Sequence, residues 1–232
     1  MVLPNIHFWF DEKRRDASGQ MALDEAAFLY SLESGEAVLR TYTWPSAAVT
    51  IGYFDDYPED EKRPVVRRMT GGGLVEHGED VTFCLTLPPI CEAAKAKTET
   101  RYRWIHECLA KVLVRQGIDL DISAEEGAVT GPCFSNPVKW DLLDDCGRKR
   151  VGGAQRKSKG GVIHQGSIQI GDHSCIGDGS GKCMRSLAGE LAGKVAKLSA
   201  SRIKILEETA NFLITGKYGT DEWCKNRKIN SG

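Results

Sequence analysis

Apolar and polar residues alternate along several short stretches of this chain, and the stretches are separated by glycine, proline and other turn residues. Alternation with a period of two residues is typical of strands with one face buried. Pro45 breaks one such run, and a loop rich in Gly, Pro, Asn and Ser over 123–137 separates two others. The pattern predicts strands over 38–44, 48–52, 64–66, 81–87, 118–122, 140–143 and 162–170, with glycine-rich turns between the last two.

Helical spacing of apolar residues predicts four helices. Ser18 can cap the first, which runs through Leu29, and Gly117 ends the second, over 98–116. Two more are expected near 186–198 and 201–215. Strands that cluster with few helices between them favour an α+β fold with helices packed on one side of the sheet. We expect one domain over 1–232 with its core at about 16–215.

Composition narrows the class of protein. A hydrophobic content of 41% over 232 residues suffices for a folded core, and a net charge of −1 gives no basic field that would attract nucleic acid. No apolar run reaches membrane-spanning length, and the N-terminus lacks the basic segment, apolar core and cleavage site of a signal peptide. We therefore expect a cytoplasmic protein with neither nucleic acid nor membrane as a partner.

The eight cysteines include no Cys-x-x-Cys pair, which argues against a compact zinc site. Free thiols are expected in a chain of this size without a secretion signal. Cys84 and Cys108 lie on apolar faces and are predicted core residues. Cys175 and Cys183 are predicted to lie in a polar, glycine-rich loop, where we do not expect a metal.

A triple-glycine turn lies between predicted strands, in the stretch Arg67-Arg68-Met69-Thr70-Gly71-Gly72-Gly73-Leu74-Val75-Glu76-His77. Glycines without a Cβ let a ligand approach the backbone, and their N–H groups can converge on an anion or a carbonyl oxygen. A P-loop is excluded, because a strand rather than a helix follows and the Gly-Lys-Ser/Thr ending is absent. Alone, the stretch also fits an ordinary hairpin with exposed arginines.

A second group of residues, later in the chain, carries side chains that could react. Cys133-Phe134 comes sixteen residues before Lys149, and Gly152-Gly153-Ala154-Gln155 and then His164 follow. A thiolate close to a positive charge is an effective nucleophile for acyl transfer. Considered alone, Cys133 would be interpreted as a thiol without a function. Lys149, which lies between Arg148 and Arg150, would be interpreted as a solvent-exposed basic residue.

In this order and spacing, the motifs resemble the lipoate branch of the biotin/lipoate protein ligase catalytic superfamily. Residues 18–24, 39–44 and 50–54 resemble its first helix and the following strands, so the resemblance spans about 16–170. It implies a single α+β domain with a mostly antiparallel sheet and helices packed on it. It also implies a substrate-binding set of Arg67, Arg68, Thr70, Gly71, Gly72, Gly73, His77, Gly152, Gly153, Ala154, Gln155 and His164.

Within that branch, Cys133-Phe134 followed by Pro137 and Trp140 resembles the cysteine-bearing octanoyltransferases. This resemblance implies catalytic roles for Cys133 and Lys149 and no cofactor. An octanoyl or lipoyl group would pass from acyl carrier protein, through a thioester on Cys133, to a lysine of a lipoyl domain or of a glycine cleavage H-like protein. Lys149, Cys133 and Gly71–Gly73 should then face one cleft.

Three departures from the family pattern keep alternatives open: Arg150 after the lysine, then Val151, and the order His164-Gln165. An alignment that puts Arg150 in the lysine's place would leave no catalytic lysine. One alternative function is an ATP-dependent lipoate–protein ligase that uses ATP and Mg²⁺. The other is a catalytically silent protein that binds an acyl chain or a lipoyl domain. The acyl donor, the acceptor and the oligomeric state stay undetermined by the sequence.

Overall fold

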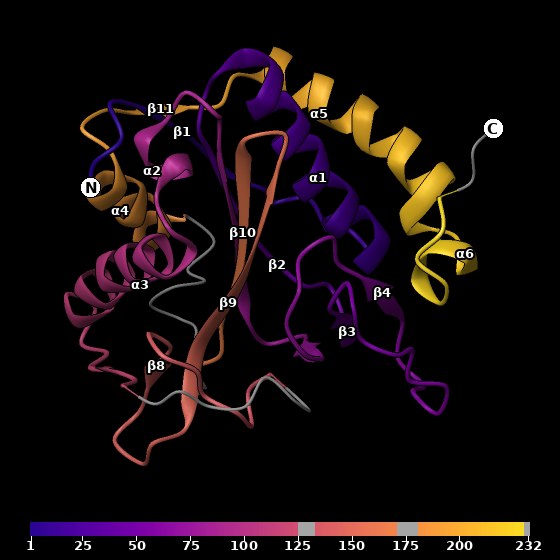
Figure 1. Cartoon of the computed structure of the whole chain (residues 1–232), viewed down its shortest axis with the longest axis horizontal. Coiled ribbons are helices and arrows are strands. Elements are labelled where there is room, and N and C mark those ends of the chain that lie inside the picture. Colours follow the sequence, from indigo (N-terminus) through magenta and orange to yellow (C-terminus); the bar gives the residue numbers. More distant parts are fainter. Residues whose placement is uncertain (125–132, 171–180, 230–232) are drawn as a thin grey trace.

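The computed structural model describes residues 1–124, 133–170 and 181–229, and its main element is an eight-stranded sheet (Figure 1). The strand order is β11-β1-β2-β6-β10-β9-β8-β7. Pairing is parallel from β11 to β2 and antiparallel from β2 to β7. The strands are β1 (Ile6–Phe10), β2 (Val38–Thr43), β6 (Val81–Leu87), β7 (Asp121–Ile122), β8 (Leu142–Leu143), β9 (Lys149–Ser158), β10 (Gly161–Ile168) and β11 (Val195–Lys197).

A second, three-stranded sheet holds the glycine turn. Its central strand β3 (Ala48–Ile51) pairs in parallel with β4 (Val65–Arg67) and antiparallel with β5 (Val75–His77). The triple-glycine turn connects β4 to β5. The turn therefore lies between two strands, as predicted, but β5 was not foreseen and comes before β6 in the chain.

The helices are α1 (Ala17–Ser34), α2 (Glu92–Lys95), α3 (Thr98–Val114), α4 (Lys182–Leu191), α5 (Ala200–Leu213), a π-helix (Ile214–Tyr218) and α6 (Asp221–Cys224). Asp16 caps α1, since its side chain accepts a hydrogen bond from the Gly19 N–H at 2.7 Å. The predicted cap, Ser18, lies inside the first turn and donates to the Tyr218 carbonyl instead. Gly35, with φ of +72°, ends the helix in the left-handed conformation that glycine favours.

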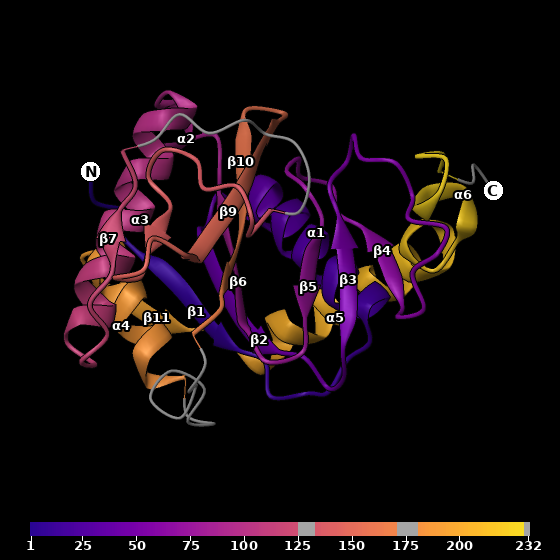
Figure 2. The same cartoon turned by 90° about the horizontal axis from the view of Figure 1, so that it is seen from below.

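Helices cover both faces of the large sheet, so the expectation of helices on one side is wrong (Figure 2). Phe83 and Leu85 of β6 pack in the core formed with α3 and α4. Cys84, between them, points to the other face, where α1 lies. Successive side chains of a strand point to opposite faces, and all seven residues of β6 are buried. A strand covered on both sides needs no polar face.

Several predicted boundaries change in the structure. Residues 186–198, predicted as one helix, divide into the end of α4 and strand β11, and residues 149–158, predicted as turns, form the long strand β9. Cys183 is buried in the first turn of α4 rather than in a loop, while Cys175 lies outside the described residues. Cys84 and Cys108 are buried, as predicted. The mixed α+β class with a mostly antiparallel sheet is confirmed.

Among the helices of the described residues, none combines the length and the apolar character needed to cross a membrane.

Candidate active site

The structure brings Cys133 and Lys149 into contact. Lys149 is the first residue of β9, its side chain is 2% exposed, and its Nζ lies 3.4 Å from the Cys133 Sγ. Cys133 is half-buried, and its N–H donates to the Leu74 carbonyl at 2.9 Å, which ties this segment to the end of the glycine turn. The ammonium group therefore lies where it can stabilise a thiolate.

A buried carboxylate holds Lys149 in this position. The Lys149 Nζ lies 2.7 Å from Asp141 Oδ2, and the Tyr102 hydroxyl donates to Asp141 Oδ1 at 2.5 Å. The Val138 N–H also donates to Asp141 Oδ2, at 2.8 Å. Burial, and then the negative charge of Asp141, raise the pKa of Tyr102 well above its usual value, so the phenol remains a neutral donor. The Asp141–Lys149 pair is buried but well supplied with partners, as a buried ion pair must be.

Two glycines of β9 make room for the side chains beside them. A Cβ on Gly152 would lie 2.1 Å from Lys149 Cε and 2.6 Å from its Nζ. A Cβ on Gly153 would lie 2.6 Å from His164 Nε2. The Gly-Gly pair after the lysine is thus required by side-chain packing, because any larger residue at 152 would displace the lysine.

Arg150 points away from this site. Its Nε lies 2.8 Å from Asp144 Oδ2, and it lines a separate surface cleft together with Gln169. The alignment with Arg150 in place of the family lysine therefore has no support in the geometry, because Lys149 is the residue beside Cys133.

A pocket opens next to the Cys133–Lys149 pair and encloses about 410 Å³, part of it open to solvent. It lies between the large sheet and the three-stranded sheet, and much of its wall is apolar side chain and glycine backbone. Only about 30 Å³ of this space is free cavity, which is below the range of about 300–1,000 Å³ seen for small-molecule sites. The lining residues are Met21, Thr50, Arg68, Val75, His77, Thr82, Cys133, Phe134, Gly152, Gly153, Ala154, Gln165, Gly166 and Ser167.

Arg68 is the cation of this pocket, and it is buried without an acidic partner among the described residues. Its Nη1 donates to Thr50 Oγ1 at 2.6 Å, and its Nη2 donates to the carbonyls of Gly73 and Gly71 at 2.9 and 3.1 Å. Burial lowers the pKa of Arg68, as expected when a charge leaves water. An unpaired guanidinium in a pocket favours an anionic or strongly polarised oxygen.

His77 continues this chain of hydrogen bonds. The Thr50 hydroxyl lies 2.8 Å from His77 Nε2, and His77 Nδ1 lies 2.8 Å from Asp80 Oδ2. Because Thr50 Oγ1 already accepts from Arg68, we assign its proton to His77 Nε2 and the imidazole proton to Nδ1. Burial opposes the charge of Asp80, but His77 and the hydroxyls around it hold the pKa of Asp80 below its usual value.

The glycine turn supports Arg68 rather than lining the pocket. Gly71 and Gly73 present their carbonyls to the arginine, and neither they nor Gly72 is among the lining residues. Gly72 has φ of +86°, and its carbonyl oxygen approaches Gly52 so closely that a Cβ there would be 1.7 Å away. The expectation that this turn lines the cleft is therefore corrected: it borders the pocket through Arg68.

Three residues of the predicted binding set lie away from the pocket. Arg67 donates to backbone carbonyls, including those of Gly52 and Cys224, and so anchors α6. Gln155 accepts from Arg101 Nε at 2.7 Å on the α3 side of the sheet. His164 is buried on that same side, stacked on Phe83, and neither of its ring nitrogens has a hydrogen-bond partner. Burial lowers the pKa of His164 well below its usual value, so it stays neutral.

Gln165 was not predicted as a site residue, yet it lines the pocket. Its Oε1 accepts from Thr70 Oγ1 at 2.7 Å, and its Nε2 donates to Asp24 Oδ2 at 2.7 Å. Thr70 is thus a buried support and not a lining residue. Strand alternation in β10 puts Gln165 and His164 on opposite faces, so the unusual order of these two residues places an amide in the pocket. Asp141 and Tyr102 were missed as well, because no local pattern marks them.

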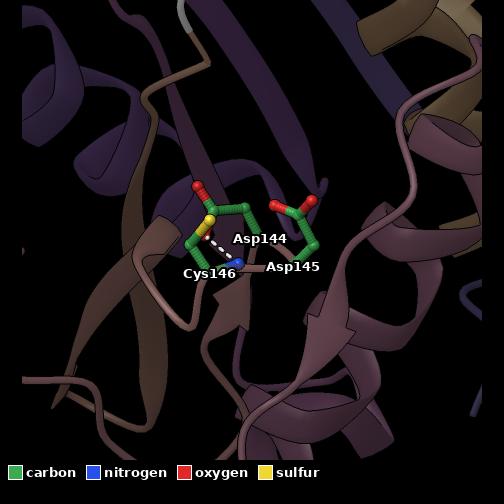
Figure 3. A group of neighbouring side chains, drawn as sticks. All are labelled: Asp144, Asp145 and Cys146. Atoms are coloured by element: carbon green, nitrogen blue, oxygen red, sulfur yellow. Dashed lines mark hydrogen bonds between the residues drawn. The ribbon is translucent and has the colours of Figure 1, made fainter.

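A group of acidic and thiol side chains at the turn between β8 and β9 does not indicate a metal site. Figure 3 shows Asp144, Asp145 and Cys146 with the Cys146 N–H donating to Asp144 Oδ1, at 3.0 Å. The guanidinium groups of Arg148 and Arg150 already neutralise the Asp144 carboxylate. Its remaining role is to hold the turn that leads into β9.

Structural comparison places the fold among lipoate ligases. A putative lipoate protein ligase from T. acidophilum with bound lipoic acid superposes with a TM-score of 0.74 at 18% identity, covering 97% of this chain and 99% of that one. A lipoate-protein ligase A bound with ATP superposes with a TM-score of 0.72 and the same identity and coverage. At this identity the likeness concerns the fold.

Sequence comparison is more specific. Octanoyltransferase LipM of Clostridioides difficile is 30% identical over 172 residues, and that of Staphylococcus aureus is 31% identical over 173 residues. These matches cover 67% and 66% of this chain and 62% of each relative, so the match spans less than two thirds of the relatives' length. Residues 16–175 match the family described as Lipoyl protein ligase A/B catalytic domain, and the chain therefore belongs to that family.

Proposed function

We propose that this protein is an acyltransferase that moves an octanoyl or lipoyl group through a thioester on Cys133 to a lysine of a second protein. One observation carries the proposal: the Cys133 Sγ lies 3.4 Å from the buried Lys149 Nζ, at the side of a largely apolar pocket. An adenylating ligase has no use for a thiol there, whereas a transferase needs it as the nucleophile.

In the first half-reaction the Cys133 thiolate attacks the thioester carbonyl of octanoyl-acyl carrier protein. A new carbon–sulfur bond forms, and the bond to the carrier's sulfur breaks. The carrier leaves as a thiolate, which takes up a proton. Lys149 favours the thiolate of Cys133 by its charge. Arg68 faces the same pocket and would stabilise the oxyanion that develops on the carbonyl oxygen.

In the second half-reaction the amine of the acceptor lysine attacks the Cys133 thioester. The amide bond forms, the bond to Sγ breaks, and the amine's proton passes to solvent. The acceptor is a lipoyl domain or a glycine cleavage H-like protein. No cofactor is required, because the energy of the donor thioester drives both steps. The acyl chain would occupy the pocket, where each buried methylene contributes roughly 0.8 kcal/mol.

Asp141 acts on this chemistry through Lys149 and is therefore a positioning residue. It fixes the ammonium between its own carboxylate, at 2.7 Å, and the thiol, at 3.4 Å. Thr50 and His77 hold Arg68 in the same indirect way.

Intact-mass analysis after incubation with octanoyl-acyl carrier protein tests the proposal. We expect a mass increase of one octanoyl group in the wild type and none in Cys133→Ala, and no requirement for ATP. Cys146→Ala is the matched control, because Cys146 is an exposed thiol in the β8–β9 turn.

Two results would reject the transferase. Transfer that requires ATP, Mg²⁺ and free lipoate, and that persists in Cys133→Ala, would establish the ligase alternative. Binding of octanoyl-acyl carrier protein or of a lipoyl domain without any transfer would establish the catalytically silent protein.

A further inference from the structure

A second groove opens on the same side of β9 as the pocket. It has a cavity volume of about 240 Å³ and lies between α1, the β9–β10 hairpin and the C-terminal segment around α6. Its floor is apolar and includes Phe28, Leu32, Met69 and Trp223. We call it the basic groove, because Arg156, Lys159 and Arg227 stand on its rim. In Figure 1 the β9–β10 hairpin and α6 lie on either side of α1.

The basic groove concentrates positive charge in a chain whose net charge is −1. Four cations and one acid line it, so their sum is +3. The acid, Glu25, is already paired with the fourth cation, Lys217, at 2.6 Å. Within the described residues, neither Arg156 nor Lys159 nor Arg227 forms an ion pair. Unpaired cations around an apolar floor are suited to a partner surface that is acidic at its edge and apolar at its centre.

The basic groove and the active-site pocket are neighbours along β9. Gly152 and Ala154 line the pocket and Arg156 lines the groove, and residues two apart in a strand share one face. The glycine turn crosses this face between them: Arg156 Nη1 donates to the Met69 carbonyl at 3.0 Å, while Gly72 lies against Ala154. Gly152, which lies beside the Lys149 ammonium group, and Arg156 are four residues apart, a distance of about 13 Å along the strand at the usual rise per residue.

This distance distinguishes the two macromolecules of the proposed reaction. An acceptor lysine reaches the thioester only through its own four-carbon stem, so its domain must dock close to Cys133. A carrier protein presents the acyl chain at the end of a long phosphopantetheine arm that itself bears a negative phosphodiester. A docking surface that begins about 13 Å along β9 from Gly152 is within reach of such an arm and is beyond the reach of a lysine stem alone.

We propose that the basic groove is the docking surface for an acidic carrier protein that delivers the acyl chain on a phosphopantetheine arm. This inference rests on the proposed function, since it assigns the donor's binding surface. Part of the groove comes from α6 and the residues after it, beyond the segment 16–175 that matches the family.

The test compares a carrier-bound donor with a small neutral one. In the double variant Lys159→Glu/Arg227→Glu, we expect the KM for octanoyl-acyl carrier protein to rise about tenfold at low salt, as for loss of charge steering at an interface rim. The KM for octanoyl-N-acetylcysteamine should stay within about twofold, because that donor enters the pocket without a protein partner. The wild-type KM for the carrier should rise with ionic strength, and the variant should lose this dependence.

The matched control is Lys111→Glu/Lys194→Glu, which makes the same change in charge. Lys111 lies on α3, on the opposite face of the large sheet, and both lysines are exposed. This control should leave both KM values unchanged. Equal losses with both donors, or an unchanged carrier KM in the groove variant, would overturn the docking proposal.

A rise in the KM for the lipoyl-domain acceptor alone would also overturn it, because the groove would then serve the acceptor. Failure of the proposed function is a separate result: the wild type would form no acyl-enzyme with either donor. Calorimetric titration of octanoyl-acyl carrier protein into Cys133→Ala, with and without the groove substitutions, then decides the docking by itself. Equal affinities of the two proteins would reject it.

Discussion

Substitution of Gly152 by alanine is a direct test of how the Lys149 side chain is held. An added Cβ would lie 2.1 Å from Lys149 Cε, whereas ordinary contacts begin at 3.4 Å, so the side chain must move by at least 1.3 Å. The same movement disturbs the 2.7 Å pair with Asp141 and the 3.4 Å contact with Cys133. The strand itself tolerates alanine, because Gly152 is not one of the glycines with positive φ.

The expected loss can be stated from these distances. A displacement of about 1 Å at a reacting group costs on the order of 100-fold in rate. Overpacking of a buried site costs about 1–3 kcal/mol, and for a chain of this length each kcal/mol lowers the melting temperature by about 2–4 °C. We therefore expect Gly152→Ala to form the acyl-enzyme roughly 100-fold more slowly, with a melting temperature lowered by about 2–12 °C.

Single-turnover acylation, followed by intact mass, measures the first quantity, and thermal unfolding measures the second. Gly189→Ala is the matched control: Gly189 lies within α4, and a Cβ there meets no atom within 4 Å. Acylation of Gly152→Ala at the wild-type rate, with an unchanged melting temperature, would refute the argument that packing against Lys149 requires glycine at position 152.

Three further predictions follow from the buried groups. Asp141→Asn should slow acylation at pH 7 and cost about 3–5 kcal/mol in unfolding free energy, because Lys149 is left buried without its carboxylate; a rate and a denaturation midpoint equal to wild type would contradict this. Burial lowers the pKa of His106 to about 4 from 6.5, so between these pH values the unfolded chain binds more protons and stability falls as the pH falls. His106 should account for about 2 kcal/mol of the loss at pH 5, and His106→Gln should flatten the pH dependence of the urea midpoint; an unchanged slope would show that His106 is not the cause. Thr50→Val should lower kcat for acylation with little change in KM, because Arg68 loses its hydrogen-bonded link to the His77 ring. The conservative variant Thr50→Ser should keep the wild-type rate. Loss of activity in both variants would instead indicate misfolding.

Local sequence was enough for the elements whose pattern is set by neighbouring residues. The sequence predicts β2, β6, β10, α1 and α3, because apolar residues recur in each with the period of its secondary structure. The glycine turn, Cys133 and Lys149 were also identifiable, since their residue types are chemically distinctive and their order along the chain is preserved. The α+β class followed from the same pattern.

Strand β9 shows where local pattern failed. Its sequence, Lys-Arg-Val-Gly-Gly-Ala-Gln-Arg-Lys-Ser, looks like a turn, yet its ten residues form a strand between β8 and β10. Glycine weakens a strand, and it is accepted here because Lys149 and His164 occupy the space that side chains at 152 and 153 would take. The reason lies in residues that are close only after folding.

The roles of individual site residues were likewise decided by the tertiary structure. A motif shows which residues occur together, but the face of the sheet onto which each side chain projects depends on strand register. Register puts Gln165 in the pocket and turns Gln155 and His164 toward α3. Asp141 directly follows Trp140, but no motif includes it, and only the packing of α3 against β9 places its carboxylate between Tyr102 and Lys149. Sequence alone thus determined which reactive residue types this chain carries, and the fold decided which of them meet, because contacts between distant residues form only when the sheet is assembled.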